Sequence, residues 1–167
     1  KLKKQKIVLG RKTINNEDKK FCFLYMDDAL LDNCLDIAKA KAEKTMAQSQ
    51  SGDVRTMKEK ISKQLQGIVA ETLVQLYLEN LSYIDEVYRF DIERKDFNYS
   101  KKEFDVDFIV DKERYTCEIR STIDHKNIGI ENWYKNNSLI GPYTNNFKKT
   151  EELNDFYKTK YYDFEDP

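Results

Sequence analysis

The chain of 167 residues is poor in cysteine and histidine, which form disulfides, metal sites and catalytic groups, and in glycine and proline, which form turns. It has three cysteines, one histidine, five glycines and two prolines. Cys22, Cys34 and Cys117 are odd in number and lack paired spacing, which argues against a disulfide framework and against a zinc knuckle. The histidine, His125, has no serine or cysteine beside it in a triad-like context. A chain of this length buries enough surface to fold without disulfides or a structural metal.

Long apolar runs and glycine-rich phosphate loops are also absent. No run approaches the roughly 18 residues of a membrane span, and neither a Walker loop nor GxGxxG occurs. The opening KLKKQKIVLG is too short for a signal peptide. We therefore expect a cytoplasmic protein without a membrane partner. The start at Lys1 and the strand-like FYKTKYYDF close to the end favour a piece of a larger, multidomain protein.

Charge is plentiful and unevenly distributed. Residues 1–66 carry 15 Lys and Arg against 9 Asp and Glu, a net charge of +6, whereas residues 67–167 carry 14 against 21, a net charge of −7. A basic half beside an acidic half suits a phosphate-binding surface next to a metal-binding site. Solvated helix faces and ordinary acidic surface explain the same asymmetry without any site.

Periodicity predicts an α/β fold with a central mixed β-sheet flanked by helices. Apolar residues at helical spacing predict helices over 29–47 and 54–81, the second capped by Asp53. Strand character is found at 6–10, at 19–26, in YRFDIER (88–94), at 103–110, at 114–122 and in the last nine-residue run quoted above. We expect residues 1–53 to form an N-terminal extension of strands and a helix, and residues 54–167 to form the main core.

The predicted hairpin 103–122 gathers acidic side chains. With its turn between Lys112 and Glu113, Asp107 lies opposite Glu118 and Asp105 lies opposite Arg120. Alternation puts all four of these side chains on one face. Crowded carboxylates repel one another unless a cation is shared, and a hard divalent ion with oxygen ligands is the usual solution. The alternative is a solvent-facing surface on which Arg120 forms cross-strand ion pairs.

Glu71 is the second acidic feature. It lies in the apolar stretch GIVAETLV, where a carboxylate is costly without a partner. Gly67 precedes it by one helical turn and removes a side chain from the same face, which would let that face approach the sheet. Glu71 could then reach the acids of the hairpin, or it could point to water from the rim of the helix.

The order of GIVAE on a helix, VDFIV on a strand and CEIRST on the next strand resembles the core of the PD-(D/E)xK nucleases, the restriction-endonuclease-like superfamily. The resemblance is clearest over residues 54–122. It implies a metal-dependent endonuclease that hydrolyses DNA with Mg²⁺, or with Mn²⁺ as a substitute, in a restriction or phage-defence setting. Enzymes of this kind often act as homodimers.

The resemblance also implies roles for individual residues. Asp107 and Glu118 match the metal-binding acids, and Glu71 matches an assisting acid of the helix. Asp105 is the rival of Asp107 and a further possible metal ligand. Asp107 is preferred, since it directly precedes FIV and lies opposite Glu118 in the predicted register.

The chain departs from the family pattern where Arg120 replaces the usual lysine. Arginine stays protonated, so it cannot accept a proton, but it can bind the scissile phosphate or orient water. Lys126 is a possible substitute lysine. The substitution also leaves open a second reading, in which a catalytically inactive scaffold of this fold binds nucleic acid or protein.

Overall fold

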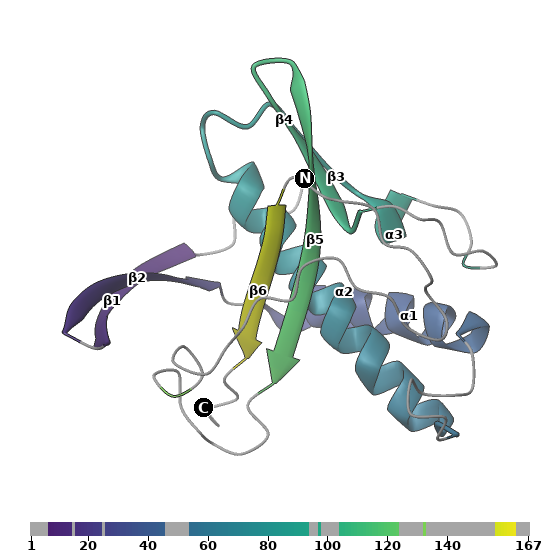
Figure 1. Ribbon diagram of the computed structural model, residues 1–167. Coiled ribbons are helices and arrows are strands. Elements are labelled where there is room, and N and C mark those ends of the chain that lie inside the picture. The colour runs from purple at the N-terminus through teal and green to yellow at the C-terminus, as the bar shows by residue number, and fades with distance from the viewer. Residues whose placement is uncertain are drawn as a thin grey trace.

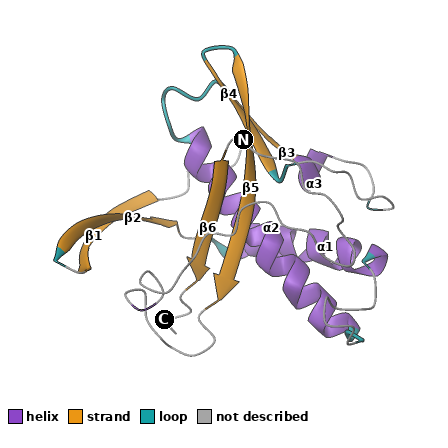
Figure 2. Cartoon of the chain, viewed as in Figure 1, coloured by secondary structure: helices purple, strands orange, loops and turns teal. Residues whose placement is uncertain are grey.

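The computed structural model describes residues 7–14, 16–24, 26–45, 54–93, 97, 104–123, 132 and 156–162. These residues form an α/β fold with two sheets and two long helices (Figures 1 and 2). Strands β1 (Ile7–Ile14) and β2 (Glu17–Leu24) form an antiparallel hairpin, which stands to one side in Figure 1. Within the described residues, no helix is long and apolar enough to cross a membrane.

The main sheet has four strands in the order β3-β4-β5-β6. Its strands are β3 (Glu86–Arg89), β4 (Val106–Val110), β5 (Glu113–Ile123) and β6 (Phe156–Tyr162). β3, β4 and β5 pair antiparallel, whereas β6 runs parallel to β5, so the sheet is mixed as the sequence predicted. The short helix α3 (Phe90–Glu93) directly follows β3. The predicted strand in YRFDIER is therefore correct only up to Arg89, after which the chain turns into a helix.

Two helices supply the rest of the architecture, and both begin at residues that satisfy their first backbone N–H groups. In α1 (Asp28–Lys44), the Asp27 side chain accepts a hydrogen bond of 2.9 Å from the Leu30 N–H. α2 (Met57–Glu79) begins with a capping box in which Thr56 and Glu59 each accept from the other's backbone N–H. The cap is thus Thr56 and not Asp53, because Thr-x-x-Glu satisfies two N–H groups at once.

The core lies between the two helices and continues to the sheet. Its buried apolar side chains are Leu30, Cys34, Ile68, Val69, Leu73 and Leu76, and Ala38 and Ala42 of α1 are fully buried beside them. α2 contacts α1 on one side and β3, β4 and β5 on the other, so it forms the middle layer (Figure 1). Cys34 and Cys117 are both buried, as predicted for core residues.

The side of the sheet that faces α2 is identified by Arg89, whose guanidinium donates to the Thr72 hydroxyl of that helix. Val106 lies opposite Arg89 on β4, and Cys117 lies opposite Val106 on β5. Both of these residues are buried. Because strand side chains alternate, Tyr88 and Asp107 point to the other face, away from α2.

The register of the central hairpin differs from the predicted one. Val106 pairs with Cys117 and Asp107 with Thr116, so Asp107 does not lie opposite Glu118. The cause is a two-residue turn at Asp111 and Lys112, whose φ angles of 50° and 68° are typical of a type I′ turn. The shift is by two residues, so the residues within β4 and β5 keep their predicted faces. Asp105 is different, because it lies at the bend before β4, where strand alternation does not fix the direction of its side chain.

Candidate functional site

Glu71 is a buried carboxyl in the middle of α2. Its exposed fraction is 5%, and its Oε2 atom has no hydrogen-bond partner. Burial is the main cause that raises its pKa to about 8, and the charge of Asp105 is the second. The alternative in which Glu71 points to water from the helix rim is therefore wrong. A Cβ added at Gly67 would meet Glu71 Oε1 at 3.9 Å, so the glycine leaves space beside this carboxyl.

Asp105 is the carboxyl that the fold brings toward Glu71. It lies at a bend directly before β4, and two backbone contacts with β5 hold it there. Its N–H donates to the Cys117 carbonyl at 3.2 Å, and its Oδ2 accepts from the Ile119 N–H at 2.7 Å. These bonds flank Glu118, so Asp105, and not Asp107, is the acid opposite Glu118. Burial raises the pKa of Asp105 as well.

Three cationic groups adjoin this pair of acids. Lys41 of α1 forms an ion pair with Asp91 of α3, and its charge opposes the rise of the Glu71 and Asp105 pKa values. Arg89 also opposes the rise at Glu71, and Arg120 opposes it at Asp105. The cluster thus draws its residues from α1, α2, α3 and the main sheet.

Glu118 and Arg120 form an ion pair along β5, with Arg120 Nη1 donating to Glu118 Oε1 at 2.6 Å. Glu118 is buried and Arg120 is partly buried. Arg120 therefore interacts with two acids: it donates a hydrogen bond to Glu118, and its charge acts on Asp105. The sequence-based alternative of a cross-strand ion pair is modified, because this pair lies within one strand.

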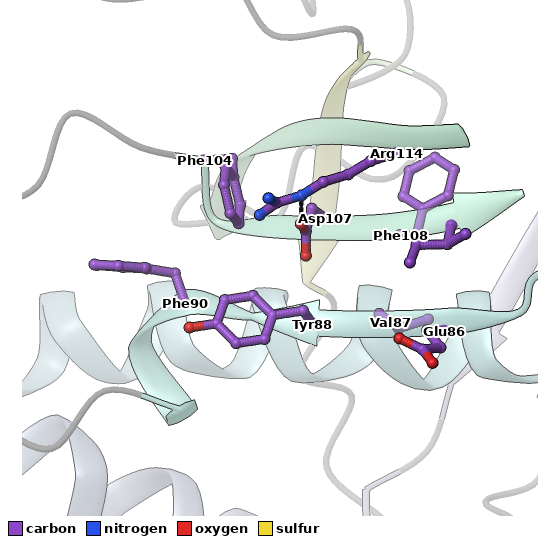
Figure 3. Close-up of a pocket in the computed structure, with 9 residues that line it drawn as sticks. Glu86, Val87, Tyr88, Phe90, Phe104, Asp107, Phe108 and Arg114 are labelled. Carbon is purple, nitrogen blue, oxygen red and sulfur yellow. Dashed lines mark hydrogen bonds and ion pairs between the residues drawn. The ribbon is translucent and has the colours of Figure 1, made fainter. Parts of the chain in front are cut away.

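Asp107 is the predicted metal ligand that the fold separates from Glu71. It points away from α2, and its carboxylate accepts a hydrogen bond from Arg114 Nε (Figure 3). One reason for preferring Asp107 over Asp105 was its predicted place opposite Glu118, and the observed register removes that reason. The other reason, its position directly before FIV, is not affected by the register. Lys126, the possible substitute lysine, lies outside the described residues.

The sequence interpretation missed Lys41, Arg89 and Asp91. A signal for Lys41 was present, because it follows the buried Ala38 by three residues and directly precedes the buried Ala42, on the side of α1 that meets α2. The alternation in YRFDIER predicts Asp91 on the polar side of a strand, whereas the structure places it in α3. Its true place depends on the switch from β3 to α3, for which the sequence gives no local signal.

The fit of a divalent cation depends on the pair Glu71 and Asp105. Among the described residues, no group of three or more His, Cys, Asp or Glu side chains is arranged to hold a metal ion. The pair nevertheless offers the ligands that a hard cation prefers, namely carboxyl oxygens. Glu71 is buried and its Oε2 atom has no partner, Asp105 is partly buried, and a cation would relieve the repulsion between the two acids. Mg²⁺ usually takes one or two protein carboxylates together with substrate phosphates, so two acids suffice.

Comparisons with known proteins find one similar protein, and its name gives no function. No family model matches the chain, and no solved structure matches it. The chain is 32% identical over 136 residues to the uncharacterized protein MJECS01 of Methanocaldococcus jannaschii. That similarity covers 79% of this chain and 49% of the archaeal protein, so the chain spans about half the length of this relative.

Proposed function

We propose that this chain is a metal-dependent endonuclease domain of the PD-(D/E)xK type that hydrolyses DNA phosphodiester bonds. The observation that carries the proposal is the proximity of the buried Glu71 carboxyl to the partly buried Asp105 carboxyl, next to the Glu-x-Arg of β5. The chain order, with an acid on α2, an acid directly before β4 and an acid on β5, is the order that the resemblance implies. Mg²⁺ is the proposed cofactor, and Mn²⁺ is its substitute.

The residues divide the work in the following way. Glu71 and Asp105 would hold the metal, which lowers the pKa of an attacking water and neutralises charge on the phosphate when it is bound. Arg120 would bind the scissile phosphate through its guanidinium, which remains protonated throughout. Glu118 fixes the direction of Arg120 through their hydrogen bond. Asp107 has no part in this arrangement.

The setting of the activity follows from the same resemblance. We propose a restriction or phage-defence enzyme that acts in the cytoplasm on DNA, as a homodimer or within a larger protein. The basic first part of the chain would supply phosphate contacts for such a substrate.

The direct test is cleavage of supercoiled plasmid with Mg²⁺ or Mn²⁺. We expect nicking that a chelator abolishes and that Glu71→Gln or Asp105→Asn reduces by at least about 100-fold, since each variant removes a proposed metal ligand. Asp85→Asn is the matched control, because Asp85 is an exposed carboxylate beside the same sheet. Cleavage that survives the chelator, or that both site variants retain, would contradict the proposal.

A catalytically inactive scaffold that binds nucleic acid or protein is the second candidate. It is favoured by the internal ion pairs of the cluster, because Arg120 already neutralises Glu118 and Lys41 already neutralises Asp91. Calorimetry distinguishes the two functions. Salt-sensitive DNA binding without any heat of Mn²⁺ or Mg²⁺ binding would support the scaffold.

A further inference from the structure

A second candidate site lies on the face of the sheet that points away from α2. It is an open pocket of about 400 Å³ between β3 and β4. Its aromatic lining includes Tyr88, Phe90 and Phe104, whose rings meet edge to face at centroid distances of 6.3 and 6.4 Å (Figure 3). The volume is within the range of small-ligand sites. The proposed metal cluster does not include any of the three rings.

Asp107 gives this pocket a hydrogen-bond acceptor. Its exposed fraction is only 4%, yet it lines the pocket, and its Oδ1 atom has no hydrogen-bond partner. Figure 3 shows its carboxylate directed into the space between β3 and β4. A buried carboxylate oxygen without a donor is costly, so a ligand that supplies an N–H group would be favoured here.

Arg114 decides which kind of ligand fits. Its guanidinium lies 5.1 Å from the centre of the Phe104 ring and donates to Asp107. The position that an ammonium ligand would take in an aromatic cage is therefore already filled by a cation of the chain itself. A flat, uncharged ring with an N–H edge remains as the favoured occupant. The Arg114 side chain is 60% exposed, so it also offers positive charge to a phosphate nearby.

We infer that this pocket binds an unpaired nucleobase, stacked on its aromatic rings and donating an N–H to Asp107. A nucleobase has a flat π-surface and, on its edge, hydrogen-bond donors beside acceptors. Its donors match the acceptor of Asp107, and its acceptors match the donors of Arg114. The inference rests on the proposed function, since a nuclease supplies the nucleic acid. It adds that the substrate carries an unstacked base that this pocket holds.

Fluorescence anisotropy with a single-stranded DNA oligonucleotide tests this inference. An abasic oligonucleotide of equal length carries the same phosphates without bases, and EDTA prevents cleavage. We expect the strand with bases to bind about 5- to 100-fold more tightly than the abasic strand. Tyr88→Leu should remove most of this preference, because Tyr88 is 39% exposed and its ring is available for stacking. Tyr88→Phe should keep it.

Tyr83→Leu is the matched control, because Tyr83 is an exposed tyrosine (62%) outside the pocket. Equal binding of both strands, or binding of neither, would overturn the inference. So would choline, a quaternary ammonium, if it competed with the strand at the pocket. Plasmid cleavage, measured separately, tests the proposed nuclease function. Metal-dependent cleavage without tighter binding of the strand with bases would support that function and contradict the assignment of the pocket.

Discussion

Arg120 occupies the position of the lysine in the resembled family, and the structure gives this arginine a partner on its own strand. Its Nη1 donates to Glu118, which is buried. An ion pair at such a depth contributes little net stability, yet losing one partner is expensive because the other charge stays buried. Arg120 and Glu118 should therefore behave as a unit.

Arg120→Met tests this coupling. We expect it to lower the free energy of unfolding by about 2–4 kcal/mol, because Glu118 loses this cation while methionine keeps the apolar volume. The double variant Glu118→Gln/Arg120→Met should be less destabilised than the sum of its single variants, measured by urea unfolding. Additive effects in this cycle would show that the two side chains are not coupled.

At the scale of elements, the β4–β5 hairpin shows how far a sequence determines a site. The alternation of apolar and acidic residues predicted both strands and the faces of their side chains. It did not predict the register, because the turn requires a positive φ angle at Lys112, which a lysine does not favour. The candidate acid consequently moved from Asp107 to Asp105.

The turn itself offers a test of the observed register. Lys112→Gly should raise the free energy of unfolding by about 1 kcal/mol, because glycine adopts a φ near 68° without strain and is preferred in this turn type. Asp85→Gly provides a comparison at an exposed loop position where no positive φ is found. A destabilised Lys112→Gly variant, measured by thermal unfolding, would argue against the turn and its register.

The helices were easier to predict than the cluster that they form. Apolar spacing predicted 29–47 and 54–81, against observed helices at 28–44 and 57–79. The proximity of Lys41 to Asp91 was beyond reach, because it depends on α1 packing against α2 and on the chain turning into α3 after Arg89. Tertiary contacts of this kind leave no mark on local periodicity.

At the scale of the whole molecule, the buried carboxyls link stability to pH. Glu71 faces Asp105 and Asp91 as like charges and Lys41 and Arg89 as opposite ones, and burial raises its pKa to about 8. An acid with a raised pKa in the folded state binds its proton more tightly than the unfolded chain does. The protonated Glu71 carboxyl therefore makes its full contribution to the free energy of unfolding below a pH of about 4.5. That contribution is lost as the pH rises towards 8. The raised pKa of Asp105 acts in the same direction.

The most direct test of the carboxyl pair as a cation site is thermal unfolding at pH 5.5 and pH 8, with and without Mn²⁺. Without metal, we expect the wild type to lose about 2–4 kcal/mol between these pH values and Glu71→Gln to lose much less. At pH 8, Mn²⁺ should raise the unfolding midpoint of the wild type and of Asp85→Asn, because a bound cation compensates the ionised pair. It should leave Glu71→Gln and Asp105→Asn unchanged. Equal midpoints with and without Mn²⁺ in the wild type at pH 8 would contradict the cation site.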